Sequence, residues 1–389
     1  MEQFDTLRPQ FDKMEQRAYI IGAAGILALL AGALVSTQQF FQSYLYGYIL
    51  WVGLTIGCLG ILILHHLVSG HWGNLIQRIV ESGARNAILM AVLFIPIVIG
   101  METLYPWMDH SKVESSHVLH AKAGYLNSSF FLARTGLFFV VWIVIAFWLS
   151  AMSSKQDTTA NPSLTRKMKI FSGPAMVLFV LSVSFASFDW MMSLEPEWYS
   201  TIYGMQMIVG GVLTTFAFSI LMLRVLAQKP PISEVINTRH IHHLGNLLMA
   251  FTILWAYMAF SQFLIIWSGN LPEDNFYYIR RVETGWSIVA LILLLGHFFV
   301  PFLLLLSRRR KRELEGLARV AAGVFVLRLV DYFWLIVPAF NHESPGIHAL
   351  DIAAPVAIGG VWVGLFIRQL KRRPLLPLHD PRFDESAEH

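Results

Sequence analysis

The stretch GHFFVPFLLLLSRRRKR, from Gly296 to Arg312, passes in one step from apolar residues to five consecutive basic ones. Its apolar part completes a block that begins near residue 284. A block of about 20 apolar residues is long enough to cross a hydrocarbon core of about 30 Å as a helix. Because lysine and arginine accumulate on the cytoplasmic side of membrane proteins, the basic run predicts that this helix ends in the cytoplasm.

The same block length recurs along the whole chain. Of its 389 residues, 56% are hydrophobic and 14% are charged, whereas soluble domains carry about 25% charged residues. The sequence therefore predicts an all-α integral membrane protein with ten transmembrane helices. We expect the spans at about 18–36, 45–68, 85–104, 130–151, 170–192, 202–226, 244–268, 284–306, 317–339 and 349–370.

The distribution of basic residues predicts how the ten helices are oriented in the membrane. The predicted inner segments hold most of the lysines and arginines, and the outer ones hold only Lys112, Lys122, Arg280 and Arg281. We therefore expect both termini in the cytoplasm. The chain then divides into an N-terminal segment (1–17), one membrane domain (18–370) and a tail (371–389), of which 379–389 has the composition of a disordered segment. The polar outer segments 105–129 and 269–283 are candidate docking loops for a partner.

Three charged residues of the first half share one depth. Glu102 ends the third predicted span, Arg134 opens the fourth, and Asp189 ends the fifth, within FDWMMSLEPEWYSTIYG (Phe188–Gly204). A charge at membrane depth costs a few kcal/mol and is a functional hypothesis by default. We expect the three to form one interior cluster, either a structural ion pair or a proton site in which one of the two acids is free to titrate.

A deeper set occurs in the second half. Arg328 lies near the middle of the ninth span, Asp331 follows one helical turn later, and His297 lies near the middle of the eighth. Arg328 and Asp331 can neutralise each other, but a titratable histidine at the same level also suits a proton relay. Pro301, in the same span as His297, predicts a kink.

Other polar residues extend the set of proton-pathway candidates. They are His65, His66, His242 and His243 at the cytoplasmic end, Gln262 in the seventh span, and Asp351 at the start of the tenth. The histidines suit hydrogen bonding at the membrane interface, and haem b ligation is the alternative. The single cysteine, Cys58, and the absence of a Cys-x-x-Cys-His motif predict no covalent haem or iron–sulphur cluster in this chain. The net charge of +4 gives no indication of nucleic-acid binding.

Three stretches carry a family resemblance: FDWMMSLEPEWYSTIYG, GHFFVPFLLLLSRRRKR and VLRLVDYFWLIVPAF (Val326–Phe340). Together they resemble the second large membrane subunit of alternative complex III, which is NrfD-like and similar to the membrane subunit of polysulfide reductase. The likeness covers nearly the whole chain. It implies two four-helix bundles, spans two to five (about 45–192) and six to nine (about 202–339), flanked by spans one and ten.

The resemblance also implies a function and a set of partners. Such a subunit belongs to a quinol:electron-acceptor oxidoreductase complex in the bacterial inner membrane. Its partners are a homologous NrfD-like membrane subunit, an iron–sulphur subunit, multihaem and monohaem cytochrome c subunits and small membrane subunits, with lipids and a terminal oxidase as further candidates. The chain itself is expected to carry no cofactor and to conduct protons, with a quinone as a candidate ligand.

Three other functions are compatible with the sequence. A stand-alone secondary transporter often has interrupted helices in matching positions of two repeats, but the proline-containing spans do not form an obvious matched pair. A haem b cytochrome would use the inner histidines. A purely structural subunit would need its buried charges only to fix the packing of the helices.

Overall fold

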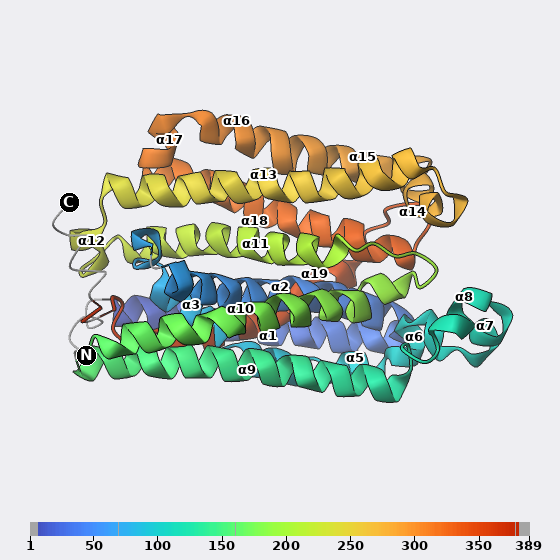
Figure 1. Cartoon of the computed structure of the whole chain (residues 1–389), viewed down its shortest axis with the longest axis horizontal. Helices are drawn as coiled ribbons and strands as arrows, with labels where there is room; N and C mark the ends of the chain where they lie inside the picture. The colour runs from blue at the N-terminus through green and yellow to red at the C-terminus, as the bar shows by residue number, and fades with distance from the viewer. Residues whose placement is uncertain (1–6, 69, 160, 378, 381–389) are drawn as a thin grey trace.

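The computed structural model describes residues 7–68, 70–159, 161–377 and 379–380. These residues are folded into helices and contain no β-strand. Among them, ten helices are long and apolar enough to cross a membrane, as the sequence predicted. Figure 1 shows them running side by side along the longest axis of the molecule.

The helices have the following bounds: α1 Arg8–Val35, α2 Thr37–Val68, α3 Gln77–Ala84, α4 Ala87–Val92, α5 Ile95–Ile99, α6 Met101–Leu104, α7 His110–Ser115, α8 His117–Lys122, α9 Ser128–Thr159, α10 Ser163–Trp190, α11 Tyr203–Leu226, α12 Ile232–Val235, α13 Thr238–Gly269, α14 Pro272–Val282, α15 Trp286–Ile292, a π-helix η5 Leu293–Phe299, α16 Val300–Leu306, α17 Arg308–Arg312, α18 Leu314–Ile336 and α19 Ala349–Leu370. Short 3₁₀ turns cover His71–Gly73, Pro106–Met108, Met192–Leu194 and Val337–Ala339.

The third span differs most from the prediction. It runs from Gln77 to Ile99, about eight residues earlier than expected at its N-terminal end, and is divided into α3, α4 and α5. Pro96 stands in the first turn of α5, where its missing N–H leaves no helical hydrogen bond unmade. The charges Arg78 and Glu81, which appeared to precede the span, therefore belong to its first turns.

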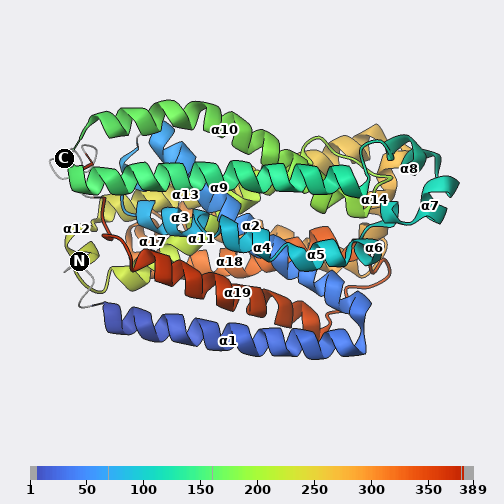
Figure 2. The same ribbon diagram turned by 90° about the horizontal axis from the view of Figure 1, so that it is seen from below.

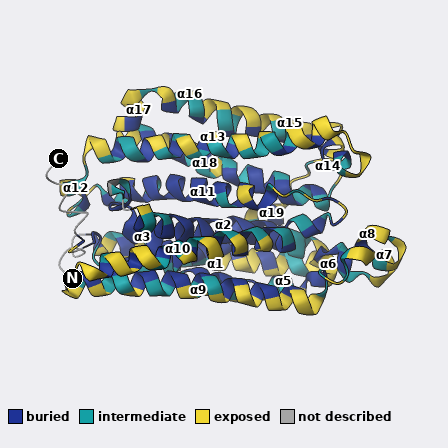
Figure 3. Ribbon diagram, in the orientation of Figure 1, coloured by how far each residue is buried: buried dark blue, intermediate teal, exposed yellow. Residues whose placement is uncertain are grey.

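Helices α2 and α11 form the centre of the molecule. Both are buried almost all round, whereas α1 and α13 bury a much smaller share of their surface (Figure 3). Glycine at residue 57 allows the two central helices to approach closely. A Cβ atom there would lie only 2.1 Å from the carbonyl oxygen of Gly211. Small residues at such crossings are typical of membrane helices. The outer helices expose apolar side chains such as Leu27 and Leu137, as expected for surfaces facing lipid.

The packing does not separate two bundles cleanly. Helix α2 contacts α3 and α10 of the first predicted group, but it also packs against α11 and α19, and α1 packs along α19. The grouping into two four-helix bundles therefore stays a prediction. Helix α1 begins and α19 ends at the same end of the molecule (Figures 1 and 2), and the membrane side to which this end belongs also stays a prediction.

The opposite end carries the two segments predicted as polar loops. They contain the short helices α7, α8 and α14 (Figure 1). The N-caps of α7 and α8 are Asp109 and Ser116, whose side chains accept hydrogen bonds from backbone N–H groups in the first turn. Local capping therefore gives these polar segments helical structure.

The segment after α19 folds back onto the chain. Lys371 pairs with Asp12 and Glu15 of α1, Arg373 pairs with Glu81, and Leu375 and Leu376 are buried. The prediction of disorder from residue 379 onward is wrong at Asp380, which is 1% exposed. Residues 381–389 lie outside the described residues.

Candidate functional site

Four neighbouring helical segments bring the deepest polar residues together. Arg328 and Asp331 come from α18, Thr214 from α11, Trp255 from α13 and His297 from the π-helix. Each of these five side chains is at most 5% exposed. We call Arg328, Asp331 and His297, with Trp255 and Thr214 around them, the buried cluster.

An ion pair forms the centre of the buried cluster. Arg328 donates from Nη1 to Oδ2 of Asp331 across one turn of α18. Its Nε donates to Oγ1 of Thr214 at 3.2 Å, and its guanidinium carbon lies 4.5 Å from the ring centroid of Tyr332. Trp255 Nε1 donates to the same carboxylate oxygen at 3.3 Å. Arg328 therefore keeps contacts that do not depend on the charge of Asp331.

His297 differs from the ion pair in having no hydrogen-bond partner among the residues that the structure describes. It is fully buried, and its ring lies 4.3 Å, centroid to centroid, from the indole of Trp255. Neither Nδ1 nor Nε2 forms a hydrogen bond with the described residues. A neutral imidazole carries one donor and one acceptor, and buried polar groups of this kind are nearly always satisfied. The hydrogen-bonding capacity of the ring is therefore unused by the described residues.

The backbone around His297 is irregular. Residues Leu293–Phe299 form a π-helix, a rare form that occurs frequently at functional sites. Pro301, in the first turn of α16, has no N–H to donate to the carbonyl of residue 297 as a regular α-helix would require. The sequence predicted a kink at this proline, and the structure shows a change of helix type immediately before it.

Two glycines make room for the cluster. A Cβ at Gly210 of α11 would lie 2.4 Å from Nη2 of Arg328, and a Cβ at Gly53 of α2 would lie 2.3 Å from the hydroxyl oxygen of Tyr332. Real Cβ atoms essentially never approach so closely. The guanidinium thus occupies space that only glycine leaves open at residue 210.

The cluster predicted in the first half is confirmed in part. Asp189 is fully buried and Arg134 is 8% exposed. Arg134 donates to Asp189 from Nε at 2.8 Å and from Nη2 at 3.0 Å, and from Nη1 to the carbonyl of Tyr125 at 3.0 Å. The rings of Tyr125 and Phe130 cover the guanidinium.

Glu102 does not belong to this cluster, so the prediction of two acids around one arginine is wrong. Its side chain is exposed and forms no ion pair with any described residue. The third span ends at Ile99, and Glu102 lies in the separate short helix α6 after the break at Gly100. A depth estimated from one continuous helix therefore misplaced it. In the remaining pair both carboxylate oxygens of Asp189 accept from Arg134, as expected for a structural ion pair.

The other candidates lie apart from the buried cluster. His65 and His66 are buried, and the ring of His65 packs against Trp72. His242 and His243 are half-buried in the first turns of α13. Gln262 donates to Tyr278 at 3.0 Å and accepts from Ser200 at 2.9 Å.

Asp351 has a structural explanation. It is residue N3 of α19, where its side chain accepts from the backbone N–H of His348 in a capping box. Its other oxygen accepts from Ser43 at 2.6 Å. Helix capping therefore accounts for an acid at the end of this span.

Sequence reasoning missed a polar cluster at the end that carries the termini. Glu81, fully buried, accepts from Arg78 at 2.8 Å and from Arg373 at 3.0 Å. Arg78 also pairs with both oxygens of Asp157 at 2.6 Å, and Ser153 accepts from Arg78 at 2.8 Å. The i, i+3 spacing of Arg78 and Glu81 was a sequence signal for this cluster, but both residues appeared to precede the third span.

A second ion pair that the sequence did not predict lies at the end of the molecule opposite the termini. Arg281 of α14 is 1% exposed and donates to Glu195 at 2.7 Å. Burial opposes the charge of Arg281, but Tyr277 and Glu195 raise its pKa. Its guanidinium carbon lies 3.6 Å from the ring centroid of Tyr277, which stacks on Trp198. Nothing in the sequence links Glu195 to Arg281, which lies 86 residues further along the chain.

A cavity of about 430 Å³ lies near this end, between α11 and α13. It is lined by Thr201, Ile202, Met205, Tyr257, Met258, Ser261, Leu264 and Ile265. None of the buried polar atoms that lack a hydrogen-bond partner belongs to these lining residues. The polar side chains of the lining are the hydroxyl groups of Thr201, Tyr257 and Ser261, which could donate to a carbonyl oxygen, and the lining contains no charged residue.

The described residues contain no group of three or more His, Cys, Asp or Glu side chains arranged to hold a metal ion. Comparison of the chain with protein-family models gave no match. A search of curated proteins found no significant relative.

Proposed function

We propose that this chain is a proton-conducting membrane subunit of a bacterial respiratory quinol:electron-acceptor oxidoreductase. Its ten candidate spans and the three sequence stretches that resemble the second large membrane subunit of alternative complex III support this proposal. The proposed location is the inner membrane, with both termini in the cytoplasm. The haem c groups and iron–sulphur clusters of the complex would be carried by partner subunits.

The observation that carries the proton role is the buried cluster. A paired carboxylate and an imidazole without a hydrogen-bond partner are both essentially inaccessible to solvent in the second half of the chain. Intramembrane ionisable residues are rare, and chains of Asp, Glu and His form the proton relays of pumps and transporters. A structural ion pair alone would leave His297 without a role.

Arg328 keeps a fixed positive charge in the buried cluster, whereas His297 and Asp331 transfer the proton. Arg328 is held by Thr214 and the ring of Tyr332, so it stays in place when Asp331 changes its protonation state. A proton on His297 passes to Asp331 through water. This transfer leaves a neutral imidazole and a neutral carboxylic acid, and the proton then leaves Asp331 while Arg328 restores the ion pair. The direction of proton transfer depends on the reactions that supply and consume protons on the two sides of the membrane.

The first half has a different role in this proposal. Arg134 and Asp189 hold helices α9 and α10 together near one end. Because Nε and Nη2 of Arg134 engage both carboxylate oxygens of Asp189 and Nη1 donates to the carbonyl of Tyr125, the pair offers no free acid for proton exit. Proton conduction is therefore assigned to the buried cluster and not to Asp189.

Two experiments test the proposal. A tagged chain isolated from its native membrane in mild detergent is expected to bring c-type haem and an iron–sulphur subunit with it; isolation of the chain alone under conditions that preserve other respiratory complexes would contradict complex membership. In that complex, D331N is expected to keep quinol oxidation but lower the number of protons released per electron. An unchanged proton yield would contradict the proton role.

A secondary transporter is less well supported. The two interrupted spans are the third, divided into α3–α5, and the eighth, which contains the π-helix. If spans two to five and six to nine are repeats, these are the second span of one and the third of the other. They do not occupy the corresponding positions that a transporter built from repeats requires.

A further inference from the structure

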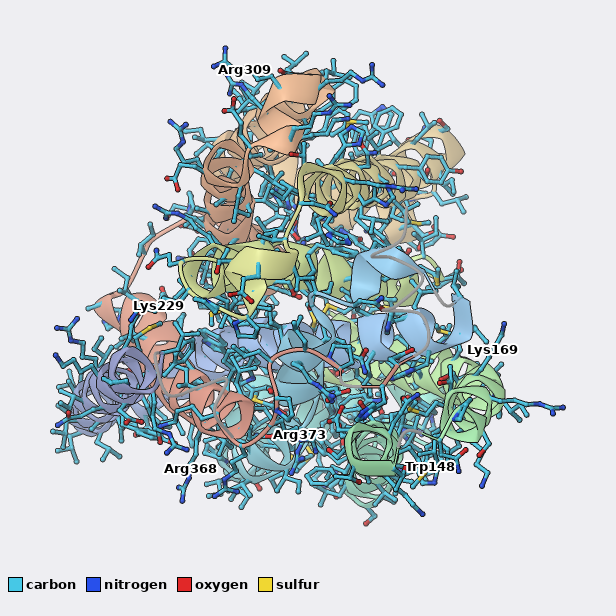
Figure 4. The ribbon with its side chains drawn as sticks, turned by 90° about the vertical axis from the view of Figure 1, so that its left-hand side faces the viewer. Trp148, Lys169, Lys229, Arg309, Arg368 and Arg373 are labelled. Carbon is cyan, nitrogen blue, oxygen red and sulfur yellow. The ribbon has the colours of Figure 1, made fainter. Side chains whose placement is uncertain are left out.

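Helix α17 concentrates positive charge at the end of the molecule that carries the termini. It consists of Arg308–Arg312 and follows α16 directly. Figure 4 views this end and shows Arg309 apart from Lys169, Lys229 and Arg368, which lie on other elements. The basic residues of α17 thus form a local group in addition to the general excess of positive charge at this end.

Most of these charges have no acidic partner in the described part of the chain. Arg309 pairs with Glu313 at 2.9 Å, and Glu315 pairs with Arg224 at 2.6 Å. Arg308, Arg310, Lys311 and Arg312 form no ion pair with the described residues. The nearest acids in the sequence are therefore already engaged, and the local field stays positive.

Lys311 is the residue that points to a ligand. Its side chain is largely buried, with 7% of the residue exposed, and its stem packs on Gly245 of α13, whose Cβ position lies 2.9 Å from Cγ of Lys311. A lysine packed in this way keeps its ammonium group near the interface. The ammonium group forms no ion pair with the described residues, so it is free to pair with an anion at the interface.

The first turns of α13 add a histidine to the same site. His242 is three residues before Gly245 and therefore on the same helix face. It interacts electrostatically with Lys311, Arg312 and Arg308. Three cations of α17 and the imidazole of α13, whose neutral form carries one N–H donor, thus lie near one another at the end of the membrane-spanning region.

We infer that Arg308, Lys311, Arg312 and His242 bind the phosphate head group of an anionic phospholipid. Basic pockets between transmembrane helices are typical sites for such lipids. The adjoining surface of α16 supports a lipid over a free anion, because Leu303 and Leu306 are 60% and 53% exposed directly before α17 and offer apolar contacts to its acyl chains. This inference does not depend on the proposed function.

The test uses the purified full-length chain in detergent. Its thermal unfolding midpoint is measured while dioleoyl phosphatidylglycerol, dioleoyl phosphatidylcholine or inorganic phosphate is added. We expect only phosphatidylglycerol to raise the midpoint saturably. Equal protection by phosphatidylcholine would show a non-specific lipid effect, and equal protection by inorganic phosphate would identify a free-anion site. Either result would overturn the inference.

Variants locate the effect. Each cation near an anionic lipid surface is worth about fivefold in affinity, so R308Q/R312Q is expected to weaken phosphatidylglycerol binding about thirtyfold. Both side chains are exposed, so the variant is expected to fold; K311Q adds an independent test. The matched control is R166Q/K169Q, which removes two exposed charges from α10 at the same end. Equal loss in the control, or no loss in R308Q/R312Q and K311Q, would contradict the site.

Discussion

Replacing Asp189 by asparagine is expected to destabilise the protein without abolishing proton conduction. The substitution removes the negative charge from a bidentate pair with distances of 2.8 and 3.0 Å. Asp189 is fully buried and the Arg134 side chain is 9% exposed, so solvent cannot replace the lost partner. Breaking a buried pair from one side costs about 3–5 kcal/mol, and the amide oxygen of asparagine still accepts one hydrogen bond. We therefore expect about 3 kcal/mol.

The assay is thermal unfolding of the detergent-purified chain, followed by the loss of the monodisperse peak on size exclusion. Asp109→Asn is the control, because its pair with Lys112 spans 3.7 Å between largely exposed side chains and such pairs contribute about 0–1 kcal/mol. The double variant R134M/D189L is expected to recover most of the loss, because it leaves no unpaired buried charge. Full stability in D189N combined with loss of proton conduction would refute the assignment of this pair to structure.

Further predictions concern packing and the two ends of the molecule. Gly210→Ala is expected to displace the guanidinium of Arg328 and to lower the free energy of unfolding by about 1–3 kcal/mol. Gly323→Ala is the control and is expected to be neutral, because a Cβ at Gly323 meets nothing within 4 Å. Equal unfolding midpoints of the two variants would contradict the steric argument. Glu81→Gln is expected to loosen the segment beyond α19, because Arg373 loses its ion pair and keeps only the hydrogen bond to the carbonyl of Ser150. Limited proteolysis detects this change, with the exposed pair variant Glu315→Gln as control.

The sequence predicted the parts of the fold that depend on composition along the chain. Ten apolar blocks were recognisable because lipid demands a fixed length of apolar helix. The Arg134–Asp189 pair was recognisable because both residues lie at one depth on neighbouring spans. Glu102 was misplaced because the third span is broken into short helices, and rise per residue measures depth only along a continuous helix.

Other features depend on contacts that no local pattern encodes. Glu195 and Arg281 meet across two segments at the end opposite the termini, and Arg373 reaches Glu81 from a distant part of the sequence. The π-helix around His297 is a property of the folded backbone, for which Pro301 was only an indirect signal. The candidate residues were thus identifiable by type and depth, whereas their partners required the structure.

We propose that protons cross this chain through the buried cluster. This proposal is tested most directly by reconstituting the purified chain in liposomes that contain a pH-sensitive dye and imposing a potassium diffusion potential with valinomycin. We expect the wild-type chain and D189N to acidify or alkalinise the lumen according to the sign of the potential. We expect H297Q and D331N to lose at least about tenfold of this rate, since a positioned acid or base contributes about 10²–10⁴-fold to proton transfer. Equal rates in folded H297Q, D331N and wild-type protein, or a wild-type rate no higher than that of protein-free liposomes, would contradict the claim.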